Sequence, residues 1–123
     1  MGLGKIFISY AKEDEEKALW LFKNLRRSEL DPWIDKNNIL VGERWEQAIY
    51  KAIKAADVVL VLLSRNSVFK RGYIQKEIRI ALRFWEEKLE EDIYLIPVRL
   101  DDCKPPEVLS GFQWANLWEL AGC

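Results

Sequence analysis

The chain has 123 residues, of which 50% are hydrophobic, and this is enough apolar material for one domain with a single core. Its 19 lysines and arginines nearly cancel its 20 aspartates and glutamates, so no net field would draw it to nucleic acid or to an anionic membrane. Histidine is absent, which excludes Ser-His-Asp and Cys-His hydrolysis and His-ligated zinc. Cys103 and Cys123 lack the spacing of metal ligands, and we find no signal peptide or long apolar run, so we expect no metal site and a cytoplasmic setting.

The first half of the chain alternates short apolar runs with helical periodicity. Residues 5–9 predict a strand and residues 14–30 a helix. Residues 32–35 predict a second strand, and its proline favours an edge position because proline cannot donate to a sheet ladder. The polar residues 36–44 predict a loop before a helix that begins at Trp45. The inward stripe of the first helix consists of four apolar residues: Ala18, Leu21, Phe22 and Leu25.

The second half contains the most apolar segment. Residues 57–64 are nearly all apolar, which is typical of a strand covered on both faces in a parallel sheet, so we expect them to form the central strand. Residues 93–100 predict a fourth strand despite Pro97, where we expect a bulge or a strand end. Residues 101–111 predict a loop and residues 112–118 a short fifth strand.

Strands that alternate with helices predict an α/β fold, a doubly wound parallel sheet with helices on both faces. A covering helix is expected after the fifth strand, but the sequence stops there. We therefore expect residues 1–123 to be a single domain of a longer chain.

A carboxylate at the edge of an apolar stripe distinguishes the helix that follows the central strand. At about 100° per residue, Glu77 lies roughly 80° from the centre of the stripe, on the boundary between core and solvent. The residues three and four places away carry no basic side chain: Tyr73, Ile74, Ile80 and Ala81. Glu77 is therefore a candidate for chemistry, although an ordinary boundary glutamate bonded to a loop amide fits its position as well. The stripe itself follows helical spacing: Ile74, Ile78, Ala81, Leu82 and Trp85.

In open parallel sheets, ligands bind beyond the carboxyl ends of the strands, where the strand order reverses. If the first and third strands are neighbours, their ends meet the start of the Glu77 helix in one crevice. The crevice would combine a carboxylate, hydroxyls, cations and aromatic rings, a mixture that suits a nucleotide or a sugar. The candidate binding residues are Ser9, Tyr10, Lys12, Trp33, Asp35, Ser64, Arg65, Tyr73 and Lys76, with Glu77 as the candidate catalytic residue.

Three nucleotide-binding or phosphate-binding classes are disfavoured. Gly2 and Gly4 precede the first strand, whereas the glycines of the dinucleotide fingerprint follow it. No phosphate loop of the GxxxxGK type occurs. A response-regulator receiver would place acids at the ends of the first and third strands, where this chain has Ser9 and Ser64.

Six segments in order resemble a Toll/interleukin-1 receptor (TIR) domain of the bacterial, NAD-cleaving type. They cover nearly the whole chain: residues 6–10, 33–35, 42–45, 59–64, 73–78 and 96–100. The resemblance implies a flavodoxin-like fold with a five-stranded sheet. It also implies that residues 36–44 form a loop that mediates self-association with other TIR domains.

The same resemblance implies a role for several residues in NAD cleavage. Glu77 matches the catalytic glutamate, Tyr73 an aromatic residue that stacks on the ligand one turn earlier, and Trp33 a ring near the nicotinamide. Lys12 follows Ala11 where some members carry a basic pair after the tyrosine. NAD would be the substrate, with no separate cofactor.

Two functions stay open at this point. The first is an NAD glycohydrolase or cyclase that acts in bacterial antiviral defence and immunity signalling when TIR domains are brought together. The second is a non-catalytic module that only recruits other TIR domains. Glu77 favours the first function.

Overall fold

The structure, a computed structural model, describes residues 4–34, 45–65, 73–86, 94–104, 107–109 and 111–117. For residues 45, 46, 73–77, 84, 85 and 108 it describes the backbone alone. The strands are β1 (Lys5–Ser9), β2 (Asp31–Ile34), β3 (Val58–Leu63), β4 (Leu95–Arg99) and β5 (Ala115–Asn116). The helices are α1 (Glu15–Arg27), α2 (Trp45–Ala55) and α4 (Tyr73–Glu86), with the short 3-10 helices η1 (Lys12–Asp14) and η3 (Glu107–Leu109).

The five strands form one sheet in the order β2-β1-β3-β4-β5, and every neighbouring pair is parallel. This confirms the predicted doubly wound parallel sheet. It also confirms that β3 is central and that β2, which contains Pro32, is an edge strand.

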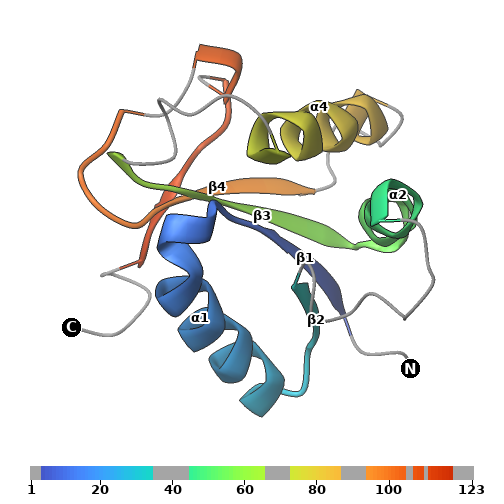
Figure 1. Cartoon of the computed structure of the whole chain (residues 1–123), viewed down its shortest axis with the longest axis horizontal. Coiled ribbons are helices and arrows are strands. Elements are labelled where there is room, and N and C mark those ends of the chain that lie inside the picture. The colour runs from blue at the N-terminus through green and yellow to red at the C-terminus, as the bar shows by residue number, and fades with distance from the viewer. Residues whose placement is uncertain are drawn as a thin grey trace.

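Two layers of helices cover the sheet (Figure 1), α1 on one face and α2 and α4 on the other. The alternation of side chains along β1 explains this division, since Ile6 and Ile8 face α1 while Phe7 faces α2 and α4. In the predicted stripes, Ala18 and Leu21 of α1 and Ile78 and Ala81 of α4 are buried, as expected.

β4 runs through Pro97 without a bulge, so the predicted break is wrong. Pro97 pairs in continuous register with Val61 of β3. The backbone carbonyl of Tyr94 and the backbone N–H of Leu100 form hydrogen bonds with β3. Because the backbone groups of successive residues in a strand point alternately to its two sides, the nitrogen of Pro97 points away from β3. On that side β5 begins only opposite Val98, so the sheet needs no donor from Pro97.

Several elements are shorter than predicted, α1 and β5 among them. α1 ends at Arg27 because Glu29 adopts a positive φ of 63°, which turns the chain out of the helix. The described part of β5 comprises two residues, Ala115 and Asn116.

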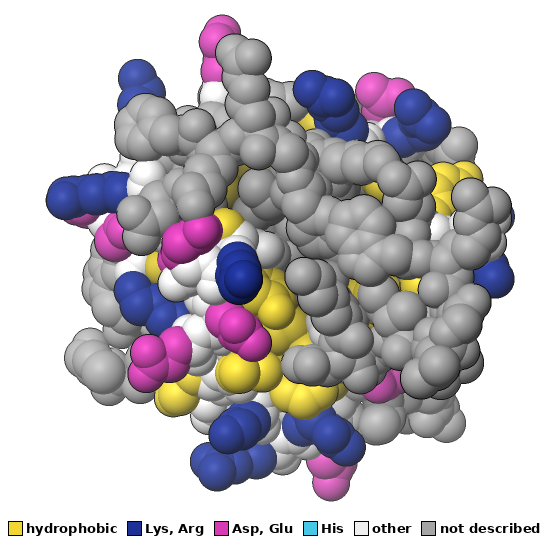
Figure 2. Space-filling view, viewed as in Figure 1, with side chains coloured by type: hydrophobic (Ala, Val, Ile, Leu, Met, Phe, Trp, Pro, Cys, Tyr) yellow, Lys and Arg dark blue, Asp and Glu magenta, His cyan; other side chains and the backbone are white. Residues whose placement is uncertain are grey.

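Basic and acidic side chains are intermingled over the face shown in Figure 2, in keeping with the near balance of charge in the sequence. In the parts of the chain that the structure describes, no helix has the length and apolar character needed to cross a membrane.

Candidate functional site

The strand order places the point where the sheet reverses between β1 and β3. β1 pairs with β2 on one side and with β3 on the other, so the chain winds outward in both directions from here. The carboxyl ends of these strands carry Ser9 and Ser64, two of the predicted binding residues. The structure thus brings together the two strand ends that the sequence suggested as neighbours (Figure 1).

A buried hydrogen bond engages Ser64. Its Oγ donates to Oδ2 of Asp14 at 2.8 Å, and both side chains are buried. Burial raises the pKa of the Asp14 carboxyl, and the hydrogen bond from Ser64 and the charge of Lys17 oppose that shift. Sequence reasoning missed Asp14, because it stands in an acidic run at the start of a helix where carboxylates are usually solvated.

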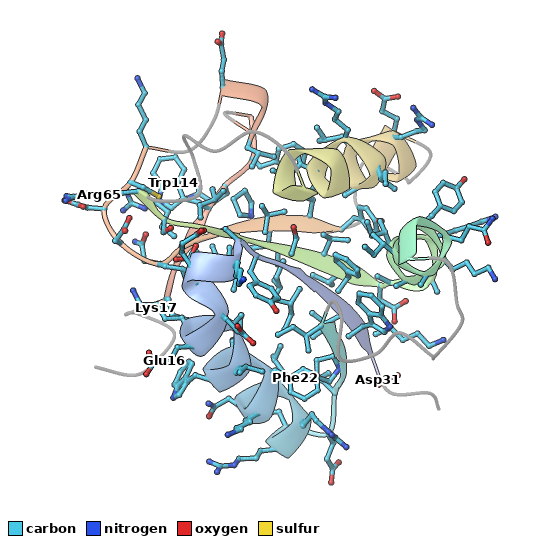
Figure 3. All side chains as sticks on the ribbon, viewed as in Figure 1. Glu16, Lys17, Phe22, Asp31, Arg65 and Trp114 are labelled. Carbon is cyan, nitrogen blue, oxygen red and sulfur yellow. The ribbon has the colours of Figure 1, made fainter. Side chains whose placement is uncertain are left out.

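Arg65 is held by the segment that follows β4. Its backbone N–H donates to Oδ2 of Asp101 at 3.1 Å, and its guanidinium forms an exposed ion pair with Asp102. Burial disfavours ionisation of Asp101, but hydrogen bonds from the backbone N–H groups of Arg65 and Cys103 outweigh it and lower the pKa of Asp101. Arg65 therefore lies beyond the carboxyl end of β3 on the side toward β4, on the opposite side of the molecule from Asp31 (Figure 3).

Ser9, the last residue of β1, and Tyr10, the next residue, face the helices on opposite sides of the sheet. Ser9 is 1% exposed and lies on the same face of β1 as Phe7, the face that α4 contacts. Within the described ranges of the chain, its Oγ has no hydrogen-bond partner. Tyr10 is buried in the cluster under α1, so packing takes up most of its ring.

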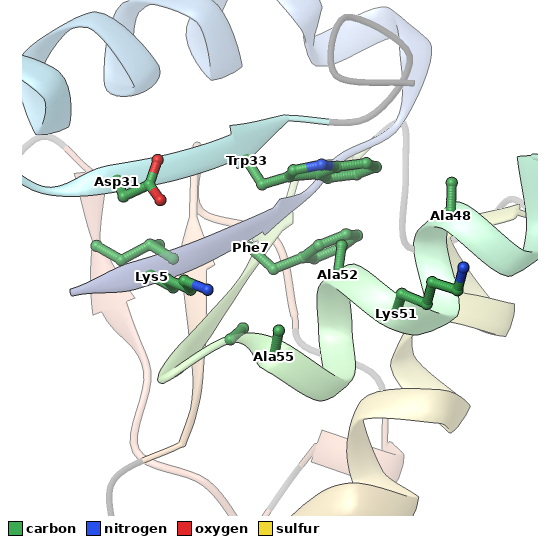
Figure 4. A pocket seen from close by; sticks show the side chains of 10 residues that line it. Lys5, Phe7, Asp31, Trp33, Ala48, Lys51, Ala52 and Ala55 are labelled. Carbon is green, nitrogen blue, oxygen red and sulfur yellow. The ribbon is translucent and has the colours of Figure 1, made fainter. Parts of the chain in front are cut away.

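Trp33 and Lys12 flank these strand ends. Trp33 is half-buried and stacks on Phe7, with ring centroids 5.1 Å apart and planes inclined by 15°. It also lines a cavity that extends toward the amino ends of β1 and β2 (Figure 4). Lys12 lies in η1 with an exposed side chain.

The predicted catalytic helix forms as expected, with Tyr73 at its first position and Glu77 one turn later. α4 contacts both β1 and β4, so it crosses the switch region of the sheet. The side chains of Tyr73, Lys76 and Glu77 lie outside the described residues, as do Asp35 and the predicted assembly loop 36–44. Their roles remain predictions.

The sequence model of the TIR domain family matches residues 6–122. A protein of Methanobrevibacter olleyae named "Probable 2' cyclic ADP-D-ribose synthase TcpO" is 31% identical over 85 residues, which are 68% of this chain and 25% of that protein. Protein y4cD of Sinorhizobium fredii (strain NBRC 101917 / NGR234) is 33% identical over 97 residues, which are 78% of this chain and 15% of that protein. The chain thus spans a quarter or less of the length of both relatives.

Among solved structures, the chain is similar to the TIR domain of the Toll-related Receptor TRR-2 from Hydra magnipapillata. The TM-score is 0.77 at 21% identity, and the match covers 94% of this chain and 86% of that one. This similarity supports the same arrangement of strands and helices. The chain belongs to the TIR domain family.

Proposed function

We propose that this TIR domain cleaves the bond between nicotinamide and ribose in NAD. The products would be nicotinamide and either ADP-ribose or a cyclic ADP-ribose. The observation that carries the proposal is that α4, with Glu77 in its second turn, contacts β1 and β4 on either side of β3, beside the point where the strand order reverses. The relative named as a probable cyclic ADP-ribose synthase supports the same chemistry.

The chemistry suits a chain without histidine. Nicotinamide leaves NAD as a neutral molecule from a cationic precursor, so its departure needs no general acid. The ribosyl transition state carries positive charge, and a positioned carboxylate stabilises it while holding a ribose hydroxyl. Glu77 would supply both interactions. Water then attacks the anomeric carbon to give ADP-ribose, or adenine attacks it to give a cyclic product.

Ser9 would hold the ligand in this scheme. Its buried hydroxyl has no partner among the described residues, and an unpaired buried hydroxyl is costly, so a substrate that bonds to it gains affinity at little cost to the protein. Trp33 and Tyr73 would offer aromatic faces, and Lys12, Arg65 and Lys76 would lie near the phosphates. Asp35 and Ser64 would supply the remaining polar groups of the binding site. Arg65 must share its charge with Asp102 for this role.

The test is release of free nicotinamide from NAD, followed by chromatography. The protein is assayed at high concentration or crowded on a surface, because self-association through residues 36–44 is part of the proposal. Glu77→Gln should lower the rate by at least about 100-fold, as expected when a group that stabilises charge in the transition state is removed. Glu86→Gln is the matched control, since Glu86 is an exposed carboxylate on the same helix. Equal release by the wild type and Glu77→Gln would refute the catalytic role.

Exposed aromatic side chains favour a second candidate, a module that only binds other TIR domains. Trp20 of α1 and Tyr50 of α2 are 43% and 42% exposed, and such rings are enriched at protein interfaces. A wild-type protein that oligomerises demonstrably and still releases no nicotinamide would support this second function.

A further inference from the structure

A cavity of about 440 Å³ lies between α2 and the edge of the sheet formed by β1 and β2. It extends from Trp33 toward Lys5 and Asp31, the first residues of β1 and β2 (Figure 4). The strand ends that carry Ser9 and Ser64 lie in the opposite direction along the sheet. The cavity is therefore separate from the crevice assigned to NAD, although Trp33 stands between the two.

The shape of this cavity follows from the sequence. Lys5, Phe7, Asp31 and Trp33 project onto the α2 face because the side chains of a strand alternate. Opposite them, α2 presents Ala48, Ala52 and Ala55, which share one helical face at spacings of four and three residues. Alanine side chains end at Cβ, so the helix cannot fill the space above the two rings.

The floor of the cavity is suited to a flat ring. Phe7 covers one face of the Trp33 indole, and β2 is an edge strand, so none of the described strands covers the other face. An aromatic ligand can stack there or pack its edge against the rings. A cavity of this volume is in the range that holds a small organic molecule.

The rim carries more positive than negative charge. Lys5 and Lys51 line the cavity together with one carboxylate, Asp31. Among the residues that the structure describes, neither lysine side chain forms an ion pair. Asp31 lies near Trp33 on β2, whereas Lys51 belongs to α2, on the other side of the cavity (Figure 4). An anionic group is therefore attracted to Lys51 and repelled by Asp31.

We propose that this cavity binds a planar aromatic anion, with its ring against Phe7 and Trp33 and its charge at Lys51, away from the neighbouring Lys5 and Asp31. The site does not depend on NAD cleavage.

Titration of the isotope-labelled protein with 2-naphthoate, followed by ¹H–¹⁵N NMR, tests the proposal. The indole N–H signal of Trp33, assigned as the one lost in Trp33→Phe, and the amides of Lys51 and Ala52 should shift and saturate, with a Kd of about 1 mM. The neutral isostere 2-naphthamide should bind at least about threefold more weakly. Equal binding of the two compounds, or shifts confined to other residues, would overturn the site.

Three variants sharpen the test. Ala52→Leu places a larger side chain in the cavity and should weaken binding by more than about tenfold. Lys51→Glu lies at an exposed helical position, so it should fold normally and weaken 2-naphthoate binding by more than about threefold. Lys54→Glu makes the same charge change on an exposed residue that does not line the cavity and should leave binding nearly unchanged. Equal effects of Lys51→Glu and Lys54→Glu on 2-naphthoate binding would refute the assigned position of the anionic group. Unchanged 2-naphthoate binding by Glu77→Gln would show that this site is independent of the catalytic proposal.

Discussion

Ser64 and Ser9 offer a matched test of what a buried hydroxyl contributes to this fold. Ser64 follows β3 and Ser9 ends the neighbouring strand β1, and the two are nearly fully buried, at 2% and 1% exposure respectively. They differ in that Ser64 Oγ donates to Asp14 at 2.8 Å, whereas Ser9 Oγ has no partner in the described portion of the chain. Replacement by alanine removes the same atom at each position, so the loss of packing is similar.

The expected effects have different sizes. A hydrogen bond to a buried charged group contributes about 2 kcal/mol, so Ser64→Ala should lower the free energy of unfolding by that amount and leave Asp14 without its donor. Ser9→Ala removes a hydroxyl that has no partner among the described residues and should change stability by less than about 0.5 kcal/mol, or increase it. For a domain of this size the first change corresponds to a fall in Tm of about 8 °C.

Urea denaturation followed by circular dichroism measures both variants against the wild type. The midpoints should separate while the slopes stay equal, because neither change alters the surface exposed on unfolding. Equal destabilisation by both variants would refute the stabilising contribution of the hydrogen bond between Ser64 and Asp14. If Ser9 binds the substrate, Ser9→Ala should also raise KM for NAD while keeping its stability.

Other consequences follow from the same structure. Burial raises the pKa of the Asp14 carboxyl in the folded state above its usual value of 3.8. As the pH rises, the unfolded chain therefore loses the proton of Asp14 before the folded protein does, and the folded state loses stability until the pH has passed the folded-state pKa. Asp14→Asn, which keeps an acceptor for the serine, should therefore gain stability relative to the wild type as the pH rises above 3.8. A relative loss of stability on the same rise in pH, measured by urea denaturation, would contradict the shift. Glu29→Gly should raise the free energy of unfolding by about 1 kcal/mol, because glycine adopts the positive φ of 63° without strain, and an unchanged or lower midpoint would argue against strain there. Tyr94→Phe removes the hydrogen bond from the phenol to the carbonyl of Ile53 at 2.9 Å and should cost about 1 kcal/mol in thermal unfolding, whereas an unchanged Tm would indicate that the bond contributes nothing.

Several features of the site could not be read from the sequence. Asp14 and Ser64 are separated by 50 residues, and only the packing of η1 beside the carboxyl end of β3 brings them together. The partners of Arg65 also come from a distant segment, since the turn after β4 supplies Asp101 to its backbone and Asp102 to its guanidinium. Tyr10 was expected to line the crevice, yet it is buried with Ile6 and Ile8 in the cluster under α1.

The sequence by itself determined the order and type of the elements, the central position of β3, the edge position of β2 and the resemblance to TIR domains. These features depend on local periodicity, which the backbone geometry of helices and strands imposes on neighbouring residues. Only the tertiary structure decided which polar groups pair, that Pro97 can lie inside a strand, and that alanines of α2 leave a cavity above Phe7 and Trp33. These outcomes depend on contacts between residues far apart in the chain, whose partners are set by how the layers pack.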